Sequence, residues 1–286
     1  MRVVIRPARD GDARVCGRIC YEAFCGVARK HGFPLDWRTE DMAVQVIEAR
    51  LAHRFTYGVV AEVDGRVAGS AFLKVYRPVG GIGPVTVAPR LQGCGVGELL
   101  MEHLLGHARK EGLEGTRLVQ AAYNPGSLSL YIKLGFEVRA LLACLHGRPL
   151  ARREEGGCPV RAGAEEDLAG CNELCMRLQG FPREEDLIEA LGLRALRVVE
   201  REGRITGYTT GIHFRGHTVG ETNEDAQALI AAAETLPDPG VLMPVENGSL
   251  VRWALRNGLR ITQPLSLMTQ GFYKEPAGAF LPSIHA

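Results

Sequence analysis

The chain has 286 residues, of which 46% are hydrophobic and 23% charged, a composition typical of a soluble globular protein and unlike that of a disordered chain. A formal net charge of +1 gives no reason to expect nucleic acid or an anionic membrane as a partner. No apolar run approaches the roughly 18 residues of a membrane span, and the first residues resemble a strand and not a signal peptide, so we expect a cytoplasmic protein.

Hydrophobic periodicity and turn residues predict an ordered series of elements in the first half of the chain. The expected elements are a strand over 3–7, helices over 10–30 and 39–51, a hairpin over 57–76, a strand over 82–88, a helix over 97–111, a strand over 116–123, a helix over 126–134 and a strand over 136–145. This order predicts an α/β fold, in which helices flank a mixed, mostly antiparallel sheet.

Two patterns in the first half recur in the second half. A strand arginine, an aspartate and two cysteines spaced by four residues occur at a constant offset, as Arg6, Asp12, Cys16 and Cys20 and again as Arg161, Asp167, Cys171 and Cys175. A hairpin pattern over 62–69 recurs over 200–207. We therefore expect two tandem copies of one unit, over 1–147 and 158–286, joined by a charged, glycine-rich linker over 148–157.

Cysteine is abundant but shows no metal-binding spacing. The eight cysteines are at positions 16, 20, 25, 94, 144, 158, 171 and 175, and none form a C-x-x-C pair. We expect buried, reduced thiols and no metal. His103 and His107 are four residues apart, as metal ligands can be, but a solvated helix edge is the favoured interpretation because no H-E-x-x-H pattern is present.

The strand over 82–88 leads into a glycine-rich turn and then into a helix. Glycines 93, 95 and 97 allow backbone N–H groups to point at a ligand, and the start of the helix adds partial positive charge. This combination predicts an anion site suited to a diphosphate. No Gly-Lys-Ser/Thr follows, and Glu98 stands where a dinucleotide loop needs glycine, so both of those phosphate loops are excluded.

A second motif, over 124–136, follows the next strand. The pattern V-x-P-x-x-Q-x-x-G-x-G, followed by N-x6-Y-x3-G-F, resembles the GNAT acetyltransferases over nearly the whole first copy. The resemblance implies that acetyl-CoA is the co-substrate and that an amine attacks it directly. It also implies that the cofactor-binding residues are Val85, Val87, Gln92, Gly93, Cys94, Gly95, Val96, Gly97 and Asn124. Tyr131 would protonate the leaving thiolate, which suits a phenol that is protonated at neutral pH.

By this resemblance, the amides of 92–97 hold the pyrophosphate, the backbone of Val85 and Val87 pairs with pantetheine, and Asn124 binds the pantetheine arm. Cys94 lies at a helix start that can activate a thiol, although a small packing or solvent-facing residue is the favoured interpretation. The general base remains open among Glu22, Asp36 and Glu221.

The second copy keeps the frame of the first but lacks its loop. No Q-x-x-G-x-G precedes the helix expected over 225–234, and Trp253 stands where Tyr131 would be aligned. We therefore expect a degenerate copy that binds no acetyl-CoA and completes the structure or the acceptor pocket. For the whole chain we expect a small-molecule amine acceptor; the alternatives are an acyl-CoA sensor without turnover and an enzyme that acetylates a protein lysine or N-terminus.

Overall fold

The computed structural model describes residues 2–150 and 159–285. The chain divides into two compact units: Met1–Val138 with Met268–Phe272 and His285, and Arg139–Leu267 with Tyr273–Ile284 and Ala286. Most of the expected linker over 148–157, and Cys158, lie outside the described residues.

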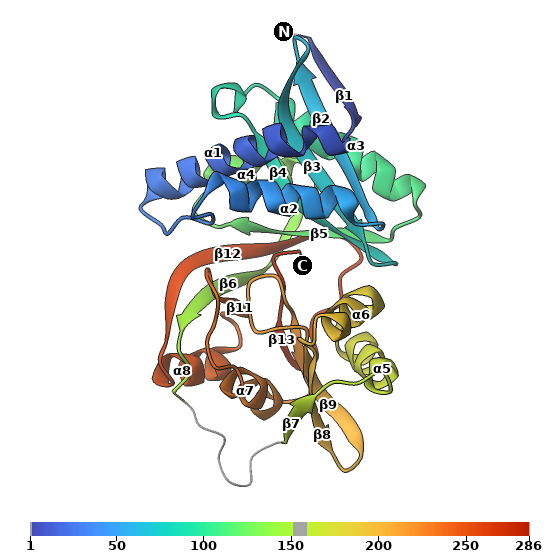
Figure 1. Cartoon of the computed structure of the whole chain (residues 1–286), viewed down its shortest axis with the longest axis vertical. Helices are drawn as coiled ribbons and strands as arrows, with labels where there is room; N and C mark the ends of the chain where they lie inside the picture. Colours follow the sequence, from blue (N-terminus) through green and yellow to red (C-terminus); the bar gives the residue numbers. More distant parts are fainter. Residues whose placement is uncertain (1, 151–158, 286) are drawn as a thin grey trace. The chain divides into compact units, whose positions relative to one another are not determined.

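The first unit alternates helices and strands in the expected order (Figure 1). Its elements are β1 (Val3–Pro7), α1 (Ala13–His31), α2 (Glu40–Ala52), β2 (Thr56–Val63), β3 (Arg66–Val75), β4 (Val79–Val87), α3 (Val96–Lys110), β5 (Gly115–Ala121), α4 (Pro125–Lys133) and the start of β6 (Glu137–Gly147). The expected α/β fold is confirmed. β4 begins at Val79, whereas the expected strand began at residue 82. Gly80 is a weak strand former, so the sequence did not indicate a strand there, but only glycine fits where Leu73 and Leu113 pack against the backbone.

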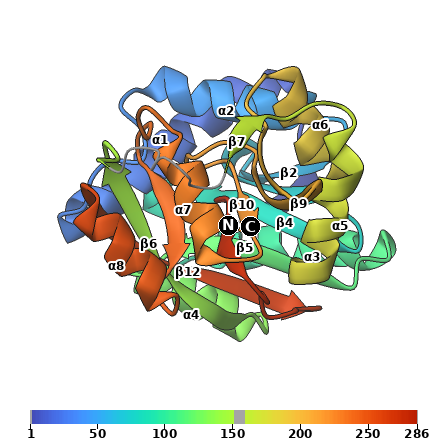
Figure 2. The same cartoon turned by 90° about the horizontal axis from the view of Figure 1, so that it is seen from below.

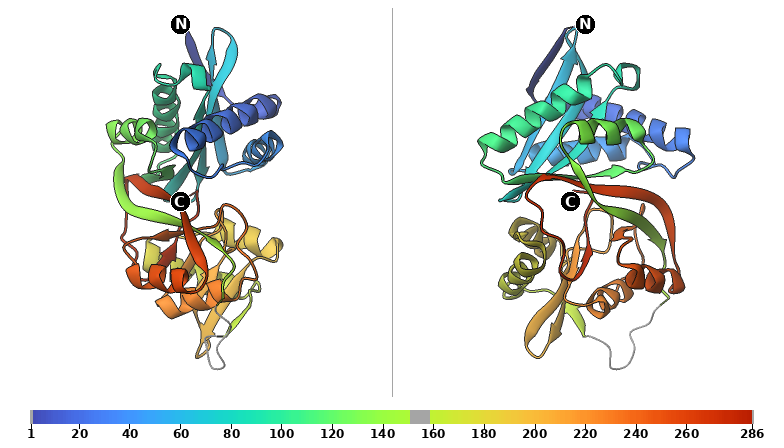
Figure 3. Two further views of the ribbon diagram at one scale, coloured as in Figure 1. Left: turned by 90° about the vertical axis from the view of Figure 1, so that its left-hand side faces the viewer. Right: turned by 180° about the vertical axis from the view of Figure 1, so that it is seen from behind.

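The sheet of the first unit is mixed. β1, β2, β3 and β4 pair antiparallel in sequence order, β4 pairs parallel with β5, and β12, whose last residues, 268–271, belong to this unit, follows β5. Helices α1 and α2 cover one face, and α3 and α4 cover the other (Figure 3). The larger apolar cluster lies under α3 and α4, where the stripe of Leu100, Met101, Leu104 and Leu105 packs against the strands.

The second unit has helices and strands in the same order, followed by one further strand. They are β7 (Val160–Ala162), α5 (Asp167–Gln179), α6 (Glu184–Gly192), β8 (Arg197–Arg201), β9 (Arg204–Thr209), β10 (Thr218–Gly220), α7 (Asn223–Ala231), β11 (Val241–Pro244), α8 (Gly248–Arg256), β12 (Leu259–Gly271) and β13 (Ala279–Leu281). One sheet has the order β13-β10-β9-β8-β7, and β11 pairs antiparallel with β6. Helices α5 and α6 pack in one apolar cluster and α7 and α8 in another (Figure 2).

The internal repeat is visible in matched ion networks. In the first unit Arg6 binds Asp12 and Glu62, each at 2.7 Å. In the second unit Arg161 binds Asp167 at 2.6 Å and Glu200 at 2.7 Å. Each network ties the first strand of its unit to the following helix and to the hairpin. The recurring arginine and aspartate of the sequence therefore have the same structural role in both units.

The described cysteines are free, and all of them except Cys94 are buried, as expected. Burial raises the pKa of Cys16 to about 11 and that of Cys171 to about 12, so these thiols stay protonated at neutral pH. Within residues 2–150 and 159–285, no three His, Cys, Asp or Glu side chains gather as metal ligands would. None of the helices in the described ranges has the length and hydropathy that a membrane span needs.

Candidate active site

The site is built where β4 and β5 separate. Their parallel pairing covers only Val79–Gly81 of β4 against Gly115–Arg117 of β5, although β4 continues to Val87 and β5 to Ala121. The other edge of β4 is bonded to β3, with Ala71 opposite Val85 and Gly69 opposite Val87. The edge of β4 at Val85 and Val87 that faces β5 therefore carries backbone groups available to an extended ligand.

The glycine-rich turn continues directly from this edge. Gln92 donates a hydrogen bond from Nε2 to the carbonyl oxygen of Val87 at 3.1 Å, which anchors the turn to the end of β4. Gly93 and Gly95 have φ angles of 77° and 83°, which side chains other than glycine rarely adopt. Gly95 is the N-cap residue of α3 and provides no side-chain cap, so the first turn of the helix is open.

Not all six amides implied by the resemblance are equally available. The amides of Gln92 and Cys94 each make a long bond of 3.4 Å inside the turn, to the carbonyl oxygens of Pro89 and Leu91. The amides of Gly93, Gly95, Val96 and Gly97 have no acceptor in the described part of the chain. These four N–H groups and the positive end of the α3 dipole form the anion-binding part of the site.

Asn124 has a structural role that the motif did not reveal. It is the N-cap of α4, and its Oδ1 accepts hydrogen bonds from the amides of Gly126 and Ser127 at 3.2 and 3.4 Å. Its Nδ2 has no acceptor among the described residues and is available to a ligand carbonyl. Ser127 in turn donates to Oε1 of Gln120 at 2.9 Å, which holds the start of α4 against β5.

Tyr131 lies inside the apolar cluster that also contains Val87 and Val96. Its ring packs at a tilt against Phe136, with centroids 5.9 Å apart, and only 7% of the residue is exposed. Burial raises the pKa of its hydroxyl above the ordinary value for tyrosine, so the group is protonated at all physiological pH values. A protonated phenol in this cluster, which includes the last residue of β4, can serve as a proton donor.

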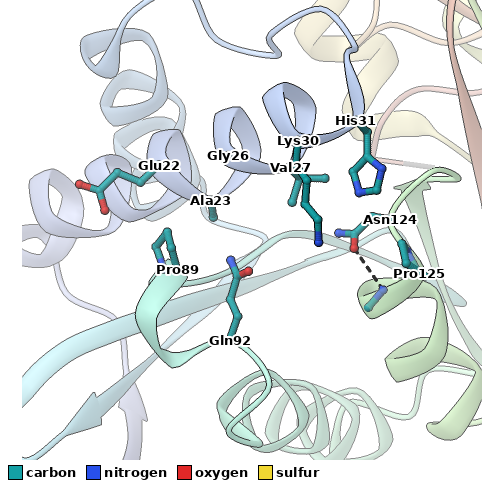
Figure 4. Close-up of a pocket in the computed structure, with 11 residues that line it drawn as sticks. Glu22, Ala23, Gly26, Val27, Lys30, His31, Pro89, Gln92, Asn124 and Pro125 are labelled. Atoms are coloured by element: carbon teal, nitrogen blue, oxygen red, sulfur yellow. Dashed lines mark hydrogen bonds between the residues drawn. The ribbon is translucent and has the colours of Figure 1, made fainter.

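A pocket of about 380 Å³ opens on the α1 side of the site. Gln92, Asn124 and Pro125 form one wall, and the C-terminal half of α1 forms the opposite wall (Figure 4). Lys30 extends from α1 toward Asn124, and Glu22 lies at the end of the pocket nearest Pro89 (Figure 4). Lys30 and His31 were not predicted as pocket residues, because polar residues near the end of an amphipathic helix are usually solvated.

The three candidate bases have different surroundings. Glu22 lines the pocket together with two of the expected cofactor residues. Asp36 is half-buried in the loop after α1 and is not among the residues that line the pocket in the described ranges. Glu221, in the second unit, is bound by Arg204 and Arg177, which keep the pKa of its carboxyl below the ordinary value. Glu22 is therefore the best placed of the three.

His103 and His107 are covered by an aromatic ring. Tyr57 stacks on His107 with centroids 3.6 Å apart, and its hydroxyl is 3.0 Å from Nε2 of His103. Partial burial lowers the pKa of His107. This contact gives the two imidazoles a packing role along the edge of α3.

Comparisons with known proteins agree with this geometry. The model of the acetyltransferase (GNAT) family matches residues 24–136. The ribosomal protein bS18-alanine N-acetyltransferase of Escherichia coli K12 is 30% identical over 108 residues, which cover 38% of this chain and 68% of that protein. This chain belongs to the GNAT family. A mycothiol acetyltransferase of Saccharomonospora viridis is 33% identical over 117 residues, and the matched part covers 36% of this chain and 38% of that enzyme.

Two solved structures share the fold over both units of this GNAT chain. A putative acetyltransferase from Pyrococcus horikoshii has a TM-score of 0.73 at 18% identity and covers 97% of this chain and 92% of its own. A GCN5-related N-acetyltransferase from Sphaerobacter thermophilus has a TM-score of 0.62 at 15% identity and covers 96% of each chain. At these identities the similarity is one of fold.

Proposed function

We propose that the chain transfers an acetyl group from acetyl-CoA to a primary amine, using one active site in the first unit. The observation that carries this proposal is the continuity between the available edge of β4 and the open start of α3. An extended pantetheine arm can pair with the edge of β4, and a diphosphate can bind at the open start of α3. Gln92 joins the two parts through its bond to Val87.

The residues present fit such a co-substrate. We assign the amides of Gly93, Gly95, Val96 and Gly97 to the diphosphate, with Gln92 and Cys94 shaping the turn around it. The backbone of Val85 and Val87 would pair with the pantetheine amides and orient the thioester carbonyl, while Nδ2 of Asn124 would donate to the same arm. A backbone N–H near the carbonyl oxygen would stabilise the charge that develops there.

The proposed chemistry is a direct transfer. The amine nitrogen attacks the carbonyl carbon, the N–C bond forms, and the C–S bond breaks. Glu22 would accept the proton released by the amine, through water, because it is the candidate base that lines the pocket. Tyr131 would give its hydroxyl proton to the leaving thiolate and recover one from solvent.

We propose a small-molecule amine as the acceptor, because the pocket is of the size that holds a small ligand and is lined by charged side chains. One observation favours a second candidate: the E. coli relative is a ribosomal protein bS18-alanine N-acetyltransferase, and 68% of its length is covered. A protein N-terminus is therefore the alternative acceptor. The further alternative is an acyl-CoA sensor, which would bind the co-substrate without transferring the acyl group.

The test is kinetic. Release of free thiol from acetyl-CoA is measured with a panel of small amines and of peptides with free N-termini, and then repeated with Tyr131→Phe. Loss of the hydroxyl should lower kcat by roughly 10²- to 10⁴-fold with unchanged acetyl-CoA affinity. Tyr57→Phe is the matched control, because it removes a hydroxyl of β2 that contacts His103 on α3 and not the proposed site. Unchanged kcat in Tyr131→Phe would remove the tyrosine from its role, and tight binding without any transfer would favour the sensor.

A further inference from the structure

The last strand of the chain occupies an unusual place in the second unit. β13 pairs antiparallel with β10, with Ala279 opposite Gly220, Phe280 opposite Val219 and Leu281 opposite Thr218. It also contacts β11, which follows α7 in the chain. β13 therefore lies between β10 and β11, whereas the corresponding strands of the first unit, β4 and β5, pair with each other and then separate.

The register shows which part of β10 is covered. In the first unit Gly69 of β3 lies opposite Val87, and two residues along Ala71 lies opposite Val85. In the second unit the repeated glycine, Gly207 of β9, lies opposite Gly220, and Thr209 lies opposite Thr218. Thr218 and Gly220 thus hold the positions of Val85 and Val87. The edge proposed to pair with pantetheine in the first unit is paired with β13 in the second.

The side chains of β13 fill both sides of this groove. Phe280 packs in the cluster under α5 and α6, with Tyr208 and Val219. Ala279 and Leu281 alternate to the opposite side and pack in the cluster with α7 and α8. All three are at most 5% exposed. At Gly278 an added Cβ would lie too close to the carbonyl oxygen of Gly220, so the approach to the groove requires glycine.

The end of the groove is also unsuited to a diphosphate. The start of α7 is closed by a capping box, in which Thr222 and Asp225 each bond the backbone N–H of the other. Glu224 adds a carboxylate to the first turn of α7, as Glu98 does in α3, and Glu221 before it is paired with Arg177 and Arg204. The amides of Thr222 and Asp225 are therefore already bonded to side chains and are not available to an anion, unlike the open amides before α3.

We propose that the second unit is a peptide-binding version of the cofactor groove and that the C-terminal segment over 278–283 is its resident ligand. Backbone pairing with Thr218–Gly220 supplies the affinity, and pockets for alternate side chains, above all Phe280, supply the specificity. The comparison between the two grooves rests on the cofactor site proposed for the first unit. The peptide groove itself is defined by β10, β11 and β13.

The test separates the strand from the chain without removing it. A protease recognition sequence is inserted after Glu275, which is exposed in the loop before β13, and the protein is cleaved. An excess of a fluorescent peptide with the sequence of residues 277–285 should then exchange into the groove, one per chain. The same peptide with Phe280→Asp should bind at least about tenfold more weakly, because burial of a phenylalanine is worth more than that factor.

Three results with the peptides alone would overturn the proposal. The cleaved chain could unfold at once, which would make β13 an indispensable core strand. It could also stay folded by circular dichroism but take up no peptide, or bind both peptides equally. Saturating acetyl-CoA should leave the bound peptide in place, and its displacement would assign the groove to the cofactor instead. Because peptide uptake requires neither transfer nor a cofactor, the failure of the proposed acetyltransferase activity would leave this result readable.

Discussion

The side-chain amide of Gln92 reaches back to the carbonyl oxygen of Val87, at 3.1 Å. This bond ties the first residue of the glycine turn to the last residue of β4. Replacing Gln92 with alanine removes one neutral hydrogen bond, worth about 0.5–1.5 kcal/mol, and loosens the turn. We expect acetyl-CoA affinity to fall by roughly two- to tenfold by calorimetry. Gln45→Ala, at an exposed position on α2, is the control, and equal affinities in both variants would contradict the anchoring role.

Asn124 combines a capping oxygen with a free amide nitrogen, and two substitutions separate these roles. Asn124→Asp keeps an oxygen that can cap α4 but removes the Nδ2 donor, so we expect wild-type stability and weaker acetyl-CoA binding. Asn124→Ala removes both, and should also lose about 0.5–2 kcal/mol of stability. Thermal unfolding and calorimetry together measure the two effects. Unchanged affinity in Asn124→Asp would exclude Nδ2 as a cofactor donor.

Glu22 lines the pocket opposite Gln92. If it accepts the proton of the attacking amine, Glu22→Gln should lower kcat/KM for the amine by roughly 10²- to 10⁴-fold. Acetyl-CoA affinity should not change, since the proposed role of Glu22 is to accept a proton from the amine. Glu48→Gln, an exposed glutamate on α2, serves as the matched control. If both variants keep the wild-type kcat/KM, the base must be sought elsewhere.

Hydrogen bonds from Arg6 are the main cause of the lowered pKa of the Asp12 carboxyl. A carboxyl whose pKa is lower in the folded chain stabilises the fold above its unfolded pKa, and this contribution is lost as the pH falls through the folded pKa. Asp12→Asn should therefore cost about 1.5–3 kcal/mol at pH 7, less below about pH 4. Denaturant unfolding at both pH values measures this, with the exposed Asp41→Asn as control. A cost that did not depend on pH would contradict the ion-pair explanation.

Local patterns predicted most of the first unit. The apolar periodicity gave α3, whose buried stripe is the expected one, and the glycines gave the turn before it. The N-cap role of Asn124 was also within reach, since asparagine before a proline is a helix-start signal. Lys30 was not predictable as a pocket residue, because its place depends on how α1 packs against the sheet.

Non-local pairing could not be predicted from the sequence. Nothing local to residues 268–271 indicates that this end of β12 belongs to the first unit, and nothing near Phe280 indicates that it pairs beside β10. Such pairings depend on strands far apart in the chain, for which a short apolar run carries no partner information. The availability of individual amides in the turn was not predictable for a different reason: it depends on the detailed turn geometry, which sets bonds such as that from the Cys94 amide to the carbonyl oxygen of Leu91.

The central claim is that each chain holds one acetyl-CoA, in the first unit. Calorimetric titration of the purified chain with acetyl-CoA tests it most directly, together with Gly95→Val, which forces a side chain onto a residue with a φ angle of 83° in the anion-binding turn. We predict one site per chain in the wild type and at least about tenfold weaker binding in the variant. Two sites per chain, or binding that Gly95→Val leaves unchanged, would contradict the account.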